Sequence, residues 1–205
     1  DNRDLKIILN IALLNKYGFK ISHIDKMSEQ EVNDKILSLN HLQAQQERFV
    51  NELIKNMVDL DMDSFEKSLN QHIAKTGIER SITQIIFPFL EKIGILWVTN
   101  HINPAQEHLV SNIIRQKVVS GIEAVQYPLQ LDKKMLLFLP EGEHHELGLL
   151  FVHFILKSRG IPVIYLGANV PLKDLQQVVT IMKPDYLYTH LTTGGNNFNF
   201  DKFLQ

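Results

Sequence analysis

Cysteine is absent from the 205 residues, so no disulfide can support the fold. No apolar run approaches the roughly 18 residues of a membrane span, and the opening Asp-Asn-Arg-Asp is unlike a signal peptide. Positive charge is not in excess either, because 21 Lys and Arg face 23 Asp and Glu. We therefore expect a globular, cytoplasmic chain with no membrane partner, in which nucleic-acid binding would need a separate, more basic element.

Helical periodicity begins at the first residues. Apolar side chains recur at helical spacing from Asp4 to about Lys16, and Gly18 follows where a C-terminal cap belongs. Ser28-x-x-Glu31 has the form of a capping box and opens another helix. Residues 1–41 are therefore predicted to form short connecting helices.

Residues 42–126 carry the pattern of a four-helix bundle. The predicted helices are Leu42–Leu60, Ser64–Thr76, Glu79–Trp97 and Pro104–Val125. Asp63 and Asn103 are candidate N-caps, Gly77 is a candidate C-cap, and Pro88 is expected to kink the third helix. Tyr127–Asp132, which contains a proline, is the predicted linker to the next domain.

The period changes in residues 133–205. Short apolar runs at Met135–Pro140, in "PVIYL" and in "DYLYTHL" alternate with two helical stretches, which predicts a β-α-β-α-β order with parallel, buried strands. Such doubly wound sheets bind ligands beyond the carboxyl ends of their strands. Glu143-His144-His145 follows the first strand, and Thr189-x-Leu191 lies at the end of the third.

A second group of polar side chains lies at helix ends of the predicted bundle. Trp97 ends one helix, and Glu107-His108 lies in the first turns of the next, so these residues are expected to face one cleft. His108 and His145 could then converge on one metal ion from two domains. The spacing of His101, His108, His144 and His145 with Glu107 fits no compact zinc motif.

Each of these residues also has an ordinary structural interpretation. A lone tryptophan such as Trp97 most often belongs to a core, and Glu107 suits the positive end of a helix dipole. His108 and His145, taken singly, are more often surface residues than ligands. The case for a site depends on the motifs falling at the element ends where one mechanism needs them.

The combination resembles MerR-family transcriptional regulators of the CarH/LitR type, light-responsive repressors with a C-terminal cobalamin (vitamin B12)-binding domain. The cobalamin-binding pattern is Asp-x-His-x-x-Gly, then about forty residues, then Ser-x-Leu, and later a Gly-Gly pair. This chain has Glu143-x-His145-x-x-Gly148, then forty residues, then Thr189-x-Leu191. "DLKIILNIALLNKYGFKISHIDKMSEQE" is similar to the end of a MerR DNA-binding domain.

The resemblance implies a role for each matched residue in the predicted sheet. His145 would be the lower axial ligand of cobalt, replacing the dimethylbenzimidazole tail of the cofactor, and Glu143 would orient it. Gly148 would leave room for the nucleotide tail. Thr189, with Thr192 and beside Leu191, would bind that tail. Gly194-Gly195 lies too close to Thr189 to be the later Gly-Gly pair of the pattern.

The bundle residues receive matching roles above the corrin. Trp97 would shield the adenosyl group of adenosylcobalamin, Glu107 would bind its ribose, and His108 would take the upper cobalt position after light breaks the cobalt–carbon bond. The cobalt ligands would thus be His145 and His108. Corrinoid methyl-carrier proteins share a similar bundle and sheet but generally lack the Trp and Glu-His pairing.

The implied fold is an α/β multidomain chain with three parts. Residues 1–41 end a MerR-like domain, residues 42–126 form the bundle, and residues 133–205 form an incomplete Rossmann-like, flavodoxin-like cobalamin domain. The implied function is a non-enzymatic effector module that senses green light through adenosylcobalamin, forms a dimer or tetramer, and acts on operator DNA through N-terminal residues that precede this chain. The alternatives are a corrinoid methyl carrier and a regulator that has lost its cofactor.

Overall fold

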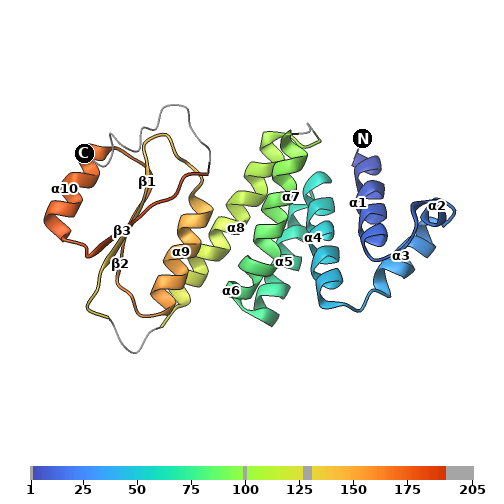
Figure 1. Cartoon of the computed structure of the whole chain (residues 1–205), viewed down its shortest axis with the longest axis horizontal. Coiled ribbons are helices and arrows are strands. Elements are labelled where there is room, and N and C mark those ends of the chain that lie inside the picture. Colours follow the sequence, from blue (N-terminus) through green and yellow to red (C-terminus); the bar gives the residue numbers. More distant parts are fainter. Residues whose placement is uncertain (1, 99–100, 127–130, 193–205) are drawn as a thin grey trace. The chain divides into compact units, whose positions relative to one another are not determined.

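The computed structural model describes residues 2–98, 101–126 and 131–192. The chain separates into two compact units, residues 1–114 and 115–205 (Figure 1). The first unit is helical and the second contains a parallel sheet with helices, which confirms the predicted fold class. Part of the predicted linker Tyr127–Asp132 and the Gly194-Gly195 pair lie outside the described residues.

The first unit begins with α1 (Asn2–Lys16), α2 (Ile21–Ile24) and α3 (Glu29–Leu37). A small core joins these helices through the buried side chains of Leu13, Leu14, Ile24 and Ile36. Gly18 has a φ of 96°, which allows the chain to turn after α1. The predicted capping box is present, because the Ser28 side chain accepts from the Glu31 amide and the Glu31 carboxylate accepts from the Ser28 amide.

The helices of the predicted bundle follow. They are α4 (Leu42–Val58), α5 (Met62–Thr76), α7 (Phe87–Val98) and α8 (Pro104–Ala124). Phe65 of α5 and Phe89 of α7 are fully buried, with ring centroids 5.5 Å apart. The N-cap of α5 is Asp61 and not the predicted Asp63, because α5 begins at Met62 and the Asp61 carboxylate accepts from the Ser64 amide. Asn103 caps α8 as predicted, since its side chain accepts from the Gln106 amide.

The third predicted helix has an internal irregularity. It consists of α6 (Ile78–Ser81), the π-helical turn η1 (Ile82–Ile86) and α7. The amide of Phe87 donates to the carbonyl of Ile82, five residues earlier. Pro88 has no amide hydrogen to give to the preceding turn, so the wide turn lies where an ordinary helical hydrogen bond is missing in any case. The expected disturbance at Pro88 is therefore a π turn immediately before it.

By length and composition alone, the continuous helical stretch Ile78–Val98 is able to cross a membrane, and no other helix in the described ranges is. This corrects the expectation that no stretch of the chain reaches that length. Several apolar side chains of this stretch pack inside the bundle, where Ile82, Ile85, Ile86 and Phe89 are buried. Such packing is typical of a bundle's central helix, so the composition is weak evidence for a membrane span.

The second unit holds a three-stranded parallel sheet in the order β2-β1-β3. Its elements are β1 (Met135–Pro140), α9 (Glu146–Ser158), β2 (Val163–Val170), α10 (Leu172–Met182) and β3 (Tyr186–Tyr188). Alternate residues of β1 face different helices. Leu137 packs with Leu149 of α9, whereas Leu136 packs with Leu175 of α10. The predicted β-α-β-α-β order is confirmed, and its strand order is that of the first three strands of flavodoxin-like sheets.

Two strands differ in length from the prediction. β2 continues to Val170, through Gly167 and Asn169 in left-handed conformations and with shifts in its register against β1. β3 is much shorter than "DYLYTHL", because its ladder with β1 ends at Tyr188. The residues after Tyr188 make other contacts, and these contacts belong to the candidate site.

Candidate functional site in the sheet unit

Glu143 is the central residue of the site at the carboxyl end of β1. Its side chain is only 3% exposed, although a carboxylate is almost never buried without partners. Oε1 accepts from the backbone amide of His145 at 3.0 Å, and Oε2 accepts from the amide of Thr192 at 2.9 Å and from the Thr192 hydroxyl at 3.2 Å. The buried carboxylate thus joins the loop after β1 to the segment after β3.

The backbone of that loop is fixed as well. The amide of Asn169 in β2 donates to the Glu143 carbonyl at 3.0 Å, and the Asn169 side-chain oxygen accepts from the Gly142 amide at 2.9 Å. Asn169 has a φ of 57°, a conformation that asparagine tolerates better than most residues. The loop from β1 to α9 is therefore held from both neighbouring strands.

His145 lies at the end of this loop, as the N-cap residue of α9. Its Nδ1 is 2.5 Å from Oε1 of Glu143, while 58% of the side chain is exposed. A carboxylate on Nδ1 favours the tautomer with the proton on that nitrogen, which leaves the lone pair on Nε2. This is the arrangement by which proteins prepare a histidine to bind a metal ion through its other nitrogen.

The segment 189–192 lies beside that histidine. Thr192 is fixed by Glu143, and the Thr189 hydroxyl is buried without a hydrogen-bond partner among the described residues. The expected role of both threonines was to bind a nucleotide tail. In the structure, Thr192 instead binds Glu143, whereas the Thr189 hydroxyl is available to another group. Leu191 is exposed.

Gly148 lies in the first turn of α9, close to the ring of His190. A Cβ atom at Gly148 would be 3.2 Å from both Cε1 and Nε2 of that ring, which is tighter than ordinary van der Waals contact. The Nε2 atom of His190 is buried and has no partner within the described part of the chain. Because Gly148 has no side chain, the His190 ring can pack against this turn of α9.

A second polar cluster supports the start of α9. Glu146 accepts from the Arg115 guanidinium, with Oε2 at 2.8 Å from Nη2 and 3.1 Å from Nε, and its Oε1 accepts from the Tyr165 hydroxyl at 2.9 Å. Burial raises the pKa of the Tyr165 hydroxyl, and the nearby Glu146 carboxylate adds to this effect. Tyr165 therefore stays neutral and donates a hydrogen bond to Glu146. This bond fixes Glu146, which is the residue next to His145.

Candidate residues in the helical unit

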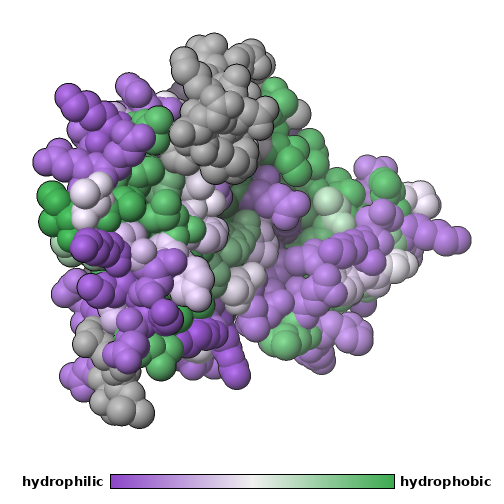
Figure 2. Space-filling model, turned by 60° about the vertical axis from the view of Figure 1, so that its left-hand side comes forward, coloured by the Kyte–Doolittle hydropathy of each residue, from purple (hydrophilic) through white to green (hydrophobic). Residues whose placement is uncertain are grey.

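Trp97, Glu107 and His108 lie near the end of α7 and the start of α8. Trp97 is 56% exposed, so its interpretation as a core tryptophan is wrong. Nδ1 of His108 is 2.9 Å from Oε2 of Glu107, and the Ser111 hydroxyl donates to Oε1 of the same carboxylate. The His108 side chain is 73% exposed. These side chains are therefore accessible at the surface. Figure 2 shows one face of the molecule, on which apolar residues lie in several places between polar ones.

No group of three or more His, Asp or Glu side chains suited to a metal ion occurs in the described ranges. A site that takes all its ligands from the protein is therefore not seen there. A corrin supplies the four equatorial nitrogens itself, so a single imidazole on each side is enough. The donor set offered by His145 fits that requirement.

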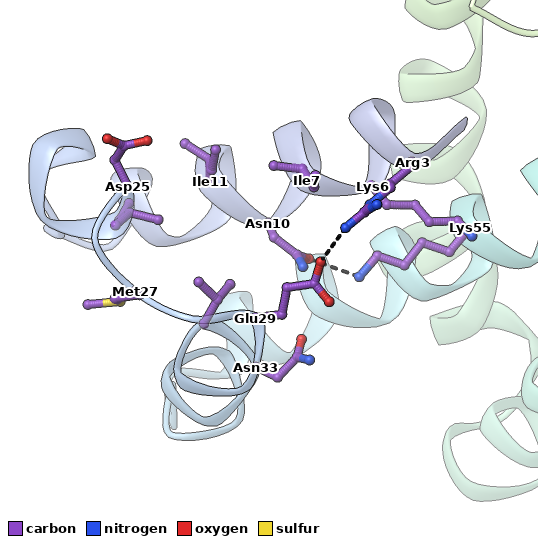
Figure 3. Close-up of a pocket in the computed structure, with 12 residues that line it drawn as sticks. Arg3, Lys6, Ile7, Asn10, Ile11, Asp25, Met27, Glu29, Asn33 and Lys55 are labelled. Carbon is purple, nitrogen blue, oxygen red and sulfur yellow. Dashed lines mark hydrogen bonds and ion pairs between the residues drawn. The ribbon is translucent and has the colours of Figure 1, made fainter. Parts of the chain in front are cut away.

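A pocket of about 480 Å³ lies elsewhere, between α1, the α2–α3 segment and Lys55 of α4 (Figure 3). Ile7, Ile11 and Val32 contribute apolar surface to it. Several of its polar groups pair with one another, since Arg3 pairs with Glu29 at 3.2 Å and Lys55 donates to Asn10 at 2.9 Å. It contains none of the candidate site residues.

Comparison with known proteins

The family described as "B12 binding domain" matches residues 50–119, which include Trp97, Glu107 and His108. The chain is 26% identical over 192 residues to the HTH-type transcriptional repressor CarH of Myxococcus xanthus, covering 91% of this chain and 64% of CarH. It is 29% identical over 143 residues to the repressor CarA of the same organism, covering 70% and 48%. The chain thus spans about half to two thirds of the length of these relatives.

Two solved structures are also similar. One is the methanol:cobalamin methyltransferase complex MtaBC of Methanosarcina barkeri, with 15% identity, a TM-score of 0.37 and coverage of 86% of this chain and 70% of that one. The other is a cobalamin-binding protein of Desulfitobacterium hafniense, with 19% identity, a TM-score of 0.31 and coverage of 70% and 69%. The chain is homologous to the CarH and CarA repressors, and the B12 binding domain family matches part of it, which confirms the predicted resemblance to CarH-type regulators.

The sequence motifs missed several residues that shape the site. Arg115, Glu146 and Tyr165 are far apart in sequence, and no spacing rule connects them. His190 had a signal that could have been used. It is two residues after Tyr188, and alternate residues of an extended chain face the same side, which for Tyr188 is the α9 side of the sheet.

Proposed function

We propose that this chain is the cobalamin-sensing effector part of a transcriptional regulator that responds to green light through adenosylcobalamin. The observation that carries the proposal is the buried Glu143 carboxylate at 2.5 Å from Nδ1 of a histidine that is itself 58% exposed. A buried carboxylate that fixes the tautomer and orientation of an exposed imidazole is the support that metal-binding histidines have in proteins. Homology to CarH and CarA supplies the regulatory context.

His145 would bind cobalt through Nε2 on the lower face of the corrin. Glu143 would keep the proton on Nδ1 and so raise the basicity of the coordinating nitrogen. Thr192 holds the other oxygen of Glu143, so the orientation of His145 is fixed from the end of β3. The buried Thr189 hydroxyl, which has no partner in the described ranges, would bind the nucleotide tail.

Trp97, Glu107 and His108 would serve the upper face. A half-exposed tryptophan offers an apolar surface that an adenosyl group can cover, and the Glu107 carboxylate can accept from ribose hydroxyls. When bound, the cofactor supplies a cobalt–carbon bond that light can break. His108 pairs with Glu107 and is exposed, so it would be accessible as a ligand in the light.

An absorption titration with adenosylcobalamin in the dark tests the lower ligand. The chain should show cobalt bound by a protein imidazole, with the benzimidazole tail displaced. His145→Ala should restore tail coordination or abolish retention of the cofactor. His144→Ala is the matched control, because His144 is the exposed neighbour and should leave the spectrum unchanged. An unchanged spectrum in His145→Ala would remove this histidine as the ligand.

Size-exclusion chromatography with light scattering, in the dark and after green light, tests the sensor function. A ligand changes assembly only through its different interactions with the two states. We expect adenosylcobalamin-dependent oligomers in the dark that dissociate in light, and we expect His108→Ala to block formation of the bis-histidine photoproduct. An unchanged mass with cofactor bound would favour a light-indifferent cobalamin sensor or carrier.

Operator DNA is the proposed partner of the whole regulator and not of these 205 residues. The formal net charge of the chain is −2, which gives no general attraction to phosphates. We therefore expect no sequence-selective retardation of operator DNA by the chain in a gel-shift assay. Tight and selective retardation would contradict this assignment.

A further inference from the structure

The space beside Gly148 at the start of α9 is filled by the side chain of His190. Both Cε1 and Nε2 of the ring would be only 3.2 Å from a Cβ at Gly148, so the ring lies directly against the helix backbone. The ring of Tyr188, two residues earlier, has its centroid 6.1 Å from that of the His190 ring and is tilted by 58° against it. The His190 ring therefore lies between the first turn of α9 and Tyr188 of β3.

The ring is held there at an energetic cost. Its Nε2 atom is buried and finds no partner among the described residues, and a buried polar group without a partner destabilises the conformation that holds it. The neighbouring Thr189 hydroxyl is in the same condition. Two adjacent unsatisfied groups at one strand end indicate a conformation that a ligand or water relieves.

The adjacent residues limit how this segment can open. Thr192 is tied to the buried Glu143 by its amide and its hydroxyl, so residue 192 remains in place while Glu143 supports His145. The β3 ladder fixes the segment on its other side, at Tyr188. Rotation of the His190 side chain is therefore the smallest movement that frees the space beside Gly148 without disturbing the Glu143–His145 pair.

We propose that His190 is a gate for the corrinoid's nucleotide tail: its ring fills the space beside Gly148 and must turn out before a tail can enter. This inference rests on the proposed function, since it assumes that a corrinoid binds at His145. His190 would therefore determine the selectivity of the chain between corrinoids with a nucleotide tail and corrinoids without one. A closed gate lowers the apparent affinity for tailed corrinoids by the fraction of open chains.

The test compares cobalamin with cobinamide, a corrinoid that lacks the nucleotide tail, by stopped-flow absorption on the full chain. His190→Ala should speed cobalamin association at least about tenfold and leave cobinamide association within about twofold of the unsubstituted chain. His190→Phe is the matched control, because it keeps a ring of similar size but removes both nitrogens. It should bind cobalamin no faster than the unsubstituted chain.

Gly148→Ala provides an independent arm. The added Cβ would lie 3.2 Å from the ring and would narrow the space that the tail enters, so the variant should slow cobalamin association and leave cobinamide association within about twofold of the unsubstituted chain. In the double variant Gly148→Ala with His190→Ala, cobalamin association should stay slower than in His190→Ala alone, because the methyl group still narrows that space. Thermal unfolding of each variant confirms that the chain is folded.

The outcomes separate the gate from the proposed function. If His190→Ala and His190→Phe both weaken cobalamin binding, the ring is a tail contact and not a gate. If cobalamin and cobinamide respond equally to His190→Ala, the ring does not act on the tail, and the gate is overturned while corrinoid binding stands. If neither corrinoid binds the unsubstituted chain in a manner that depends on His145, the proposed function fails, and the gate fails with it.

Discussion

Glu143 and Glu107 both lie beside a histidine that we assign to cobalt, yet the two carboxylates are held in opposite ways. Glu143 is buried, accepts from the backbone amides of His145 and Thr192, and connects two loops of the sheet unit. Glu107 is about one-third exposed, belongs to the first turns of one helix, and contacts His108 and Ser111 of that same helix. One carboxylate depends on tertiary structure, and the other depends on helical spacing alone.

This difference indicates that the two histidines would have different roles as cobalt ligands. A ligand that must stay in place during every cycle benefits from a buried, fully bonded support, since that support fixes its orientation before the cofactor arrives. A ligand that must be absent in the dark and present in light needs freedom to move. The exposed His108 has that freedom, and His145 keeps only one ring nitrogen uncommitted.

The largest expected effect comes from removing the buried carboxylate. Glu143→Ala should lower the free energy of unfolding by about 2–3 kcal/mol, because it leaves the Thr192 amide and the His145 ring without their partner. It should also abolish retention of cobalamin. Chemical denaturation and gel filtration with the cofactor measure the two effects.

Glu141→Ala is the control for that substitution, because Glu141 is an exposed residue of the same loop. We expect its free energy of unfolding to change by less than about 0.5 kcal/mol. A Glu143→Ala chain as stable as the Glu141→Ala chain would show that the bonds of Glu143 are not needed for the fold of the loop.

Acid is expected to have an intermediate effect on folding stability, through one histidine in each of the two units. Burial lowers the pKa of His72, which stacks on Phe49 in the helical unit, and of His153, which stacks on Tyr165 in the sheet unit. The unfolded chain takes up protons near pH 6.5, whereas these folded residues do so only at lower pH. Their contribution to stability is complete above about pH 6.5 and declines as the pH falls through the folded pKa values.

His72→Phe and His153→Phe keep the stacked rings but remove the titration. Each variant should lose less stability than the unsubstituted chain between pH 7.5 and pH 5.5, as measured by urea denaturation at both values. The Nε2 atom of His72 is buried without a partner in the described residues, so its replacement should not destabilise the chain at pH 7.5. A slope that is identical in all three chains would contradict the assignment of these protons.

The smallest effect on folding is expected at Trp97. Because the side chain is half-exposed, Trp97→Ala should change the free energy of unfolding by less than about 0.5 kcal/mol. It should nevertheless weaken dark assembly with adenosylcobalamin more than it weakens cofactor retention, since retention would depend mainly on His145. Light scattering and gel filtration of one sample give both quantities, and equal losses in the two would contradict this division.

Local patterns predicted much of this architecture. The capping box at Ser28, the turn at Gly18 and the alternation of strands and helices after residue 133 depend on neighbours in sequence, and they are present in the structure. The pairing of Glu143 with His145 also needs only two residues of separation. Helical and extended periodicities, caps and short loops are short-range properties, so the sequence contains them directly.

The long-range contacts were decided only by the tertiary structure. Thr192 reaches Glu143 across 49 positions, and this contact changes the expected role of that threonine. The packing of His190 against Gly148 likewise depends on which surfaces meet. The sequence by itself determined the elements and the residue types at their ends, because these follow from local backbone preferences. Which partner each buried polar group finds was settled by packing, because burial removes water and leaves only the groups that the fold brings near.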